Sequence, residues 1–449
     1  MGGGVLPLRG DNGNGQRGEC MEKANSGQDG GGRPGGAYGT RPLLVMAGLF
    51  FIIGFVTWLN GPLITFVQVA FGVGPVGAFL VPMCFYLAYF FCAFPAMALA
   101  RRTGLRGGIR LALGIMAAGT LGFGECVGRG WYAGALAGLS VLGAGLTLLQ
   151  VAVNPYVTLL GPAAQAARRI AGMGIANKLS GIIAPIIFSL LVMHDIGGVV
   201  ARLAASGNAR MHAQVLAGFA HAVVLPYRGM AVVLLLVALG LRHAGLPDLR
   251  LACRDAAPPG GRMAGMAWVG IAVVFVYVGV EVMAGDGIGL YARGMGLLVG
   301  QTRFLTAFTL AGMLGGYVLG SFMVPAVIRS APYLGLSALV GGALCTGAIM
   351  AHGMGSVLCI ALLGVANAMM MPILFPLVLH MAGAWRQRAN ALLVMAFCGG
   401  AVMPQCFALL QGPWGMKPAF MGLVMPGYGV IGLFALVVWW RARGLGRAA

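Results

Sequence analysis

The sequence predicts an all-α membrane protein with twelve transmembrane helices in two six-helix halves and both termini in the cytoplasm. Of the 449 residues, 59% are hydrophobic and only 9% are charged, whereas soluble domains carry about 25% charged residues. Twelve apolar segments are each long enough for a bilayer, which needs about 20 residues per helix. Basic residues gather in alternate connections, as expected for an even number of spans.

The twelve apolar segments follow one another along most of the chain, and several contain Gly or Pro. The stretch from Met263 to Val280 has no charged or amide side chain. Strands of a transmembrane barrel would instead alternate polar and apolar residues over about 10 positions, so helices are predicted. We place them at residues 43–66, 76–99, 107–126, 132–160, 170–193, 223–241, 264–284, 304–326, 331–352, 355–380, 390–411 and 417–440.

The formal charge of +19 is explained by orientation in a bilayer rather than by binding to nucleic acid. With both termini in the cytoplasm, 21 of the 29 basic residues fall in the tails and connections on that side. Seven fall on the opposite side, and Lys178 lies within a segment. This asymmetry follows the positive-inside rule, and it makes the lipid bilayer the expected partner.

The predicted organisation has two halves joined by a linker. Residues 1–41 form a Gly-rich cytoplasmic tail that we expect to be disordered and that does not resemble a signal peptide. Residues 42–241 form the first half, 242–263 a cytoplasmic linker rich in Pro and Gly, 264–440 the second half and 441–449 a basic tail. Ser180–Pro185 resembles Gly399–Pro404, which suggests that the halves are repeats.

Polar side chains within the apolar segments indicate a transporter. A charged side chain near the bilayer centre costs about 2.5–3.5 kcal/mol, so Lys178 and Glu281 must face a cavity, water or each other. Gln150 and Asn154 share one helix face, and their amides can both donate to and accept from sugar hydroxyls. Helix–helix hydrogen bonding is the alternative role for such amides.

The candidate substrate-binding residues are Trp58, Asn60, Gln150, Asn154, Asn177 and Asn367. The ring of Trp58 offers an apolar face to the C–H groups of a sugar, although a packing role is also open. Asn60 precedes a Gly-Pro pair where a helix can open locally. For Asn177 and Asn367, packing between helices is the default interpretation.

The candidate ion-coupling residues are Glu281, Lys178 and Asp286. Glu281 is the leading one, because it is the acidic residue placed well inside a predicted span, where it can bind H+ or Na+. Lys178 belongs to the other half. The two can form a permanent pair or a latch that depends on the transport state, or Lys178 can extend to the cytoplasmic surface. Asp286 can cap a helix, shape the entrance or be solvated.

No cofactor, metal site or enzyme motif is predicted. The nine Cys residues include no CxxC pair, and the six His residues have no metal-ligand spacing. No catalytic triad or phosphate-binding loop is present either. The polar residues therefore point to binding and release of a small molecule.

Four stretches resemble bacterial glucose/galactose transporters of the fucose-galactose-glucose:proton symporter family, within the major facilitator superfamily. They are Phe50–Ile64, Leu148–Val157, Met173–Lys178 and Tyr277–Asp286. The resemblance implies a monomer of the bacterial inner membrane that takes up a hexose, glucose and/or galactose, by alternating access coupled to H+ or Na+.

Two positions depart from the fucose permease branch of this family. That branch uses an Asp in the first helix and a Glu in the fourth for proton coupling, and the corresponding residues here are Gly61 and Gln150. Neither exchanges a proton at physiological pH. An uncoupled sugar facilitator and an exporter of a drug or metabolite therefore remain alternatives.

Overall fold

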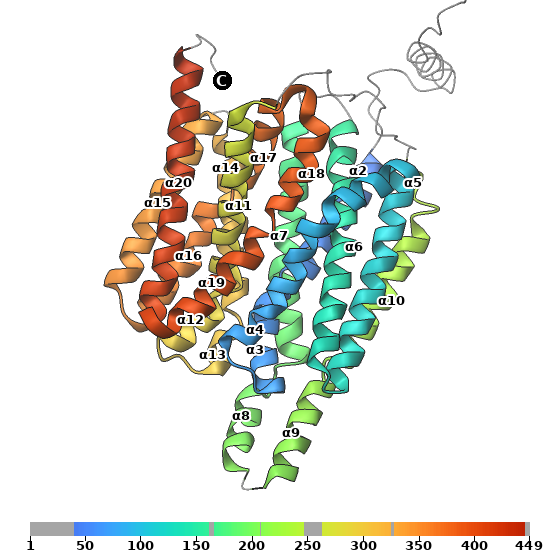
Figure 1. Ribbon diagram of the computed structural model, residues 1–449, viewed down its shortest axis with the longest axis vertical. Helices are drawn as coiled ribbons and strands as arrows, with labels where there is room; N and C mark the ends of the chain where they lie inside the picture. Colours follow the sequence, from blue (N-terminus) through green and yellow to red (C-terminus); the bar gives the residue numbers. More distant parts are fainter. Residues whose placement is uncertain (1–39, 161–165, 207, 247–262, 325–326, 445–449) are drawn as a thin grey trace, which may run out of the picture.

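A computed structural model describes residues 40–160, 166–206, 208–246, 263–324 and 327–444 of the chain. All regular elements in these ranges are helices, packed side by side in an elongated bundle (Figure 1). Eleven helices of this described part are long and apolar enough to cross a membrane. Large apolar side chains such as Leu225, Phe322 and Leu339 are exposed on the outside of the bundle, as a bilayer requires.

The helices before the predicted linker form one side of the bundle, here called the N-terminal group (Figure 1). Its members are α2 (Thr40–Thr57), α3 (Asn60–Phe71), α4 (Pro75–Ala78), α5 (Leu80–Gly128), α6 (Tyr132–Leu159), α7 (Ala166–Leu191), α8 (Ile196–Ala205), α9 (Ala209–His221) and α10 (Val224–Gly240).

The later helices form the other side, here called the C-terminal group. Its members are α11 (Gly265–Gly285), α12 (Ile288–Gly294), α13 (Val299–Thr302), α14 (Leu305–Met323), α15 (Ser330–Met350), α16 (Gly353–Asn367), α17 (Met370–Met381), the 3₁₀ turn η2 (Gly383–Trp385), α18 (Arg386–Ala396), α19 (Gly399–Trp414) and α20 (Met416–Gly444).

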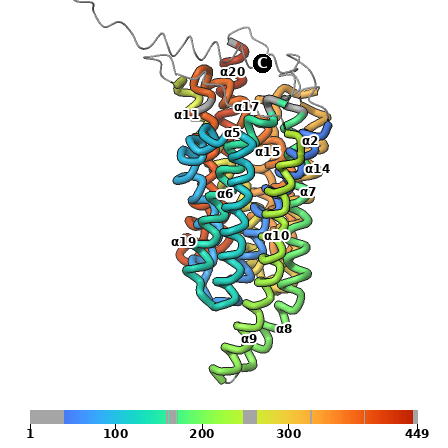
Figure 2. Tube along the Cα trace, turned by 90° about the vertical axis from the view of Figure 1, so that its right-hand side faces the viewer, coloured from blue at the N-terminus to red at the C-terminus, as the bar shows by residue number. Residues whose placement is uncertain are grey.

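The two groups meet along a seam. On one side of it α7 packs against α14, and on the other α5 packs against α18 and α19. The tube in Figure 2 shows the blue and green helices in front of the red and orange ones. The described chain begins and ends at the same end of the bundle, and α8 and α9 project from the opposite end (Figures 1 and 2).

Helix α5 contains two of the predicted segments, 76–99 and 107–126. With α4 it forms a 54-residue apolar stretch, which would reach about 80 Å if straight, far beyond the roughly 30 Å of a bilayer core. Gly104 interrupts it with φ +71° and ψ 166°, a conformation that only Gly adopts easily. The chain turns back at this point, so the two arms lie beside each other (Figure 1).

Four predicted segments are broken, and the sequence predicts a local opening at only one of these places, beside Gly61-Pro62. Segment 43–66 is divided at Trp58–Leu59, segment 76–99 at Phe79, segment 355–380 at Ala368–Met369 and segment 390–411 at Phe397–Cys398. The first break comes just before Asn60-Gly61-Pro62, where the missing N–H of proline weakens the helix ladder. By contrast, α6 continues through Pro155 to Leu159.

The stretch between the fifth and sixth predicted segments holds α8 and α9, for which the sequence prediction had no elements. Each has an apolar and a polar face, and Asn208 caps α9 by accepting a hydrogen bond from the Arg210 N–H at 2.8 Å. Their lengths of 10 and 13 residues are too short for a span, so a search for apolar segments passes over them.

Candidate functional site

The break between α2 and α3 places Trp58 at the seam. Its side chain is buried, with 3% of its surface exposed. A Cβ atom added to Gly181 of α7 would lie 2.5 Å from the ring, and one added to Gly285 of α11 would lie 2.6 Å from it. The ring therefore fits between the two helix groups because both facing residues are glycines.

Lys178 and Glu281 form a buried ion pair across the seam. The Lys178 ammonium of α7 donates a hydrogen bond to Oε1 of Glu281 of α11 at 2.7 Å, with only 7% and 11% of the two side chains exposed. The ammonium also lies 4.4 Å from the centre of the Trp58 ring, within the range of a cation–π interaction. Lys178 thus does not extend to the cytoplasmic surface, which was one of the alternatives.

Asp286 follows α11 directly and is also buried, with 1% of its surface exposed. The solvated role considered for it is therefore wrong. Neither carboxyl oxygen has a hydrogen-bond partner among the described residues. Gly61 of α3 faces this carboxyl, since a Cβ atom there would lie 3.1 Å from Oδ1 of Asp286 and 2.5 Å from Oγ1 of Thr306.

The amides of α6 are only partly engaged by the protein. Nε2 of Gln150 donates to the hydroxyl of Tyr89 at 2.8 Å, and this tyrosine packs edge-on against Phe397 from the C-terminal group. Asn154, one turn later on α6, is half-buried. Asn60 is 1% exposed, and its amide nitrogen has no hydrogen-bond partner in the described part of the chain.

The other two candidate amides hold helices together within one group. Nδ2 of Asn177 donates to the carbonyl of Phe50 at 3.3 Å and so joins α7 to α2. Asn367 is fully buried at the end of α16. The Tyr428 hydroxyl donates to its Oδ1 at 2.9 Å, and the Tyr277 hydroxyl donates to its backbone carbonyl at 3.1 Å. This geometry favours the packing role for both residues.

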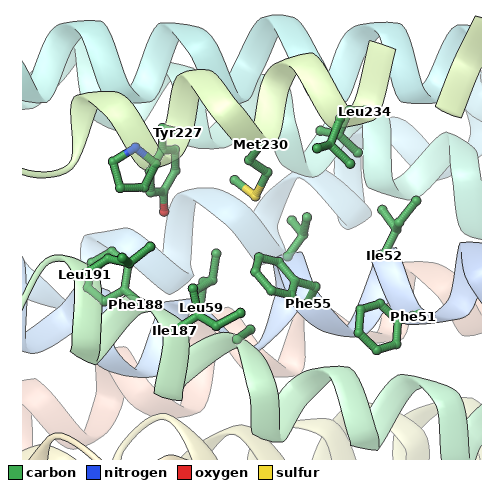
Figure 3. A pocket seen from close by; sticks show the side chains of 14 residues that line it. Phe51, Ile52, Phe55, Leu59, Ile187, Phe188, Leu191, Tyr227, Met230 and Leu234 are labelled. Carbon is green, nitrogen blue, oxygen red and sulfur yellow. The ribbon is translucent and has the colours of Figure 1, made fainter. Parts of the chain in front are cut away.

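Two cavities lie away from this cluster. Figure 3 shows the first, of about 340 Å³, between α2, α7 and α10 of the N-terminal group. Apart from Tyr227 its lining is apolar, for example Phe51, Phe55 and Met230, so it does not suit sugar hydroxyls. The second, of about 450 Å³, opens between the two groups near the end that carries α8 and α9, and Gln68, Arg293 and Gln411 contribute to its lining.

Contacts at the same end hold the two groups together, and the sequence prediction did not identify them. The Arg293 guanidinium donates to Oε1 of Gln68 at 2.5 Å. Arg303 donates to the carbonyls of Met193 and His194, just after α7, at 3.3 and 3.2 Å. From the sequence, Arg293 and Arg303 are predicted only as basic residues on the side opposite the cytoplasm. No signal in a single sequence indicates which residue of the other half each one meets.

No group of three His, Cys, Asp or Glu side chains is close enough to hold a metal ion among the described residues. The site consists of one ion pair, one carboxyl without a partner, an indole ring and several amides. Such groups can bind a neutral polar molecule and a proton, and they lie where two helix groups meet. The arrangement suits reversible binding coupled to movement of the groups.

The relatives found by sequence comparison are named as sugar transporters or symporters. A Helicobacter pylori protein assigned as a glucose/galactose transporter is 30% identical over 366 residues, 80% of this chain and 86% of the relative. The glucose/galactose transporter of Brucella abortus is 29% identical over 398 residues, 87% of this chain and 92% of the relative. The L-fucose-proton symporter of Escherichia coli is 26% identical over 410 residues, 88% of this chain and 92% of the relative.

Solved structures with a similar fold include two major facilitator transporters. The major facilitator transporter FucP, in an outward conformation, superposes with a TM-score of 0.70 at 24% identity, covering 88% of this chain and 98% of the other. The proton:xylose symporter XylE has a TM-score of 0.62 at 16% identity, with coverage of 89% and 94%. No protein-family model matches the chain.

Proposed function

Because the chain belongs to the fucose-galactose-glucose:H+ symporter family of the major facilitator superfamily, as a relative of its glucose/galactose transporters, we propose that it takes up a hexose together with protons. It is a multi-pass membrane transporter of sugars and not an enzyme. Glucose and galactose are the proposed substrates, since the two relatives at 29–30% identity bear those names. Proton coupling is favoured by the fucose-proton symporter among the relatives.

The proposed topology has twelve helices and both termini in the cytoplasm of a bacterium, with the protein in the inner membrane. Dividing α5 at Gly104 turns the eleven candidate spans into twelve. The described ends of the chain lie at one end of the bundle (Figure 1), and the basic residues assigned to the cytoplasm include Arg41 and Arg441 next to these ends. We assign residues 42–241 and 264–440 to the two halves, joined by a linker at 242–263, and expect a monomer.

The Lys178–Glu281 pair is the observation that carries the proposal. It joins α7 of one half to α11 of the other in a water-poor seam, so rocking of the halves must change its environment. Removing one partner from such a pair costs about 3–5 kcal/mol, because a charge is left buried and alone. A pair of this kind can stabilise one closed state of the transporter.

Trp58, Asn60, Gln150 and Asn154 are the proposed sugar contacts. They lie on α6 and at the α2–α3 break, and the Asn60 amide has hydrogen-bonding capacity left over. Hydroxyl groups of a hexose can take up that capacity, and an indole ring suits the apolar face of the sugar. A sugar bound at this place would contact groups next to the ion pair. Sugar binding would therefore be coupled to changes at the ion pair.

The test is uptake of labelled glucose and galactose in a bacterial strain that lacks its own sugar transporters. Wild type is compared with Glu281→Gln, each with and without a protonophore and with sodium replaced. As a control, Glu125→Gln removes an acidic residue whose partner Arg228 is exposed. For wild type and for the control, we expect sugar to accumulate. The protonophore should abolish this accumulation, and replacement of sodium should leave it unchanged.

Other results would favour other functions. Equilibration that does not depend on an ion gradient would identify an uncoupled facilitator, which the glycine at position 61 and the glutamine at 150 allow. Dependence on sodium would assign the coupling to Na+. No movement of either sugar would contradict the proposal and direct attention to export of a drug or metabolite.

A further inference from the structure

Asp286 lies at a contact between the two halves. It follows α11 of the C-terminal half, and its Oδ1 would be 3.1 Å from a Cβ atom on Gly61 of the N-terminal half. The side chain is 99% shielded, and neither oxygen has a hydrogen-bond partner within the described residues. The backbone N–H of Gly61 lies close enough to the carboxyl to lower its pKa, but neither oxygen accepts a hydrogen bond of normal geometry from a described residue.

The charges around Asp286 balance only if its carboxyl is neutral. Lys178 of α7 and Glu281 of α11 already cancel each other at 2.7 Å. An ionised Asp286 would leave one net negative charge in a seam that excludes water, and a buried charge without a partner is strongly disfavoured. Tyr86 of α5 also faces this region and offers no positive charge.

Position 61 determines whether Asp286 fits. A Cβ atom there would lie 2.5 Å from Oγ1 of Thr306 in α14, which is closer than van der Waals contact allows. The hydroxyl of Thr306 donates to the carbonyl of Gly285 at 2.9 Å, so it is held in place. Glycine on one half therefore leaves the space that a carboxyl from the other half fills.

We propose that Asp286 carries the transported proton, whereas Glu281 stays ionised as the fixed partner of Lys178; this rests on the proton-coupled sugar uptake proposed above. Asp286 is a second acidic group at the seam, and unlike Glu281 it has no counter-ion within hydrogen-bonding distance among the described residues.

The proton is loaded and released as the halves move. When they separate, water reaches Asp286, and the carboxylate can take a proton from the side that is open. Closing buries the neutral acid between Gly61 and Thr306, and opening on the other side hydrates it so that the proton leaves to water. One proton crosses per sugar, and no bond other than the O–H bond of the acid forms or breaks.

The same environment sets the pH dependence. Burial raises the pKa of the Asp286 carboxyl, which lies just beyond the end of the α11 span, well above its usual range; the charge of Glu281 raises it further, and the backbone N–H of Gly61 and the charge of Lys178 lower it. A raised pKa means that the proton stays bound at mildly acidic and neutral pH and is lost as the pH rises. Accumulation of sugar should therefore decline toward alkaline pH.

The experiment separates sugar exchange from proton-driven accumulation, with the full-length protein in proteoliposomes. Exchange of labelled for unlabelled glucose needs no net proton movement, whereas accumulation under an imposed pH gradient does. Asp286→Asn has the shape of the neutral acid and binds no proton. It should exchange glucose at a rate close to wild type, while its accumulation ratio under the gradient falls to that of simple equilibration.

Asp195→Asn is the matched control, because Asp195 pairs with Arg202 at an exposed position outside the seam. It should accumulate glucose like wild type. Accumulation by Asp286→Asn with the pH dependence of wild type would overturn the inference. Absence of exchange in wild type itself would overturn the proposed function instead, so the two failures are distinguishable.

An infrared spectrum of the wild-type protein provides a test that does not depend on how a variant folds. A protonated carboxyl has a C=O stretching band that a carboxylate lacks. The band should be present at neutral pH, disappear when the pH is raised and persist in Asp195→Asn. A wild-type spectrum with no protonated carboxyl at neutral pH would show that Asp286 is ionised and would contradict the inference.

Discussion

Neutralising either member of the Lys178–Glu281 pair should destabilise the protein more than neutralising both. At 2.7 Å and an effective dielectric constant of about 20, the two charges attract each other by about 6 kcal/mol. In Glu281→Gln the Lys178 ammonium keeps its contact with the Trp58 ring, which is worth only about 0.5–2 kcal/mol. The loss of the attraction therefore dominates, and a net loss of about 3–5 kcal/mol is expected.

The assay is a double-mutant cycle of Lys178→Met, Glu281→Gln and the two combined. Unfolding of the purified protein in mixed micelles gives the free energy of unfolding for each variant. The exposed pair Arg228–Glu125, which has a similar separation of 2.6 Å, is the matched control. Its cycle should show little coupling because solvent screens both charges.

Simple additivity would refute this reasoning. If the double variant loses as much stability as the two single variants together, the pair contributes no interaction of its own. The charge-swapped variant, Lys178→Glu with Glu281→Lys, adds a functional comparison. It should regain part of the transport lost in the single variants, but not all of it, because the new lysine would no longer lie over the Trp58 ring.

Three further predictions concern single side chains. Gln150→Leu should raise the KM for sugar about fivefold, from the roughly 1 kcal/mol of one neutral hydrogen bond, as measured by uptake kinetics. Asn367→Leu leaves the Tyr428 hydroxyl buried without its partner, so the free energy of unfolding should fall by about 1–3 kcal/mol while the KM of the folded protein is unchanged. Gly61→Ala should slow transport at least about fivefold, because overpacking by a methyl group costs about 1–3 kcal/mol at the seam. Gly48→Ala, with nothing within 4 Å of the added Cβ, should leave the rate unchanged.

Sequence reasoning predicted the helical membrane fold well, because apolar length is a local property. Each of the twelve predicted segments has helices at its place in the structure. The opening beside Gly61-Pro62 was expected, but the breaks at Ala368–Met369 and Phe397–Cys398 were missed, since a break depends on what fills the space beside it. The turn of α5 at Gly104 falls in the gap predicted between segments 76–99 and 107–126.

The candidate site could be predicted only in part. Polar residues in apolar segments identified Lys178 and Glu281, yet their pairing depends on the register of two helices from different halves, which a single sequence does not reveal. Asp286 was placed at a helix end, where solvation is the ordinary expectation, and its burial comes from the close approach of Gly61. Asn177 and Asn367 have the same residue type as Asn60, but their neighbours give them packing roles.

The position of Trp58 between two glycines has a consequence for how such a protein can change over evolutionary time. The indole and the absent side chains of Gly181 and Gly285 share one volume, although they come from the α2–α3 break, α7 and α11, and so from both halves. A larger residue at either glycine is tolerable only if the ring becomes smaller, and a smaller ring leaves a void unless a glycine is replaced. The residues at these three positions should therefore vary together among relatives, because their side chains must fill the same volume.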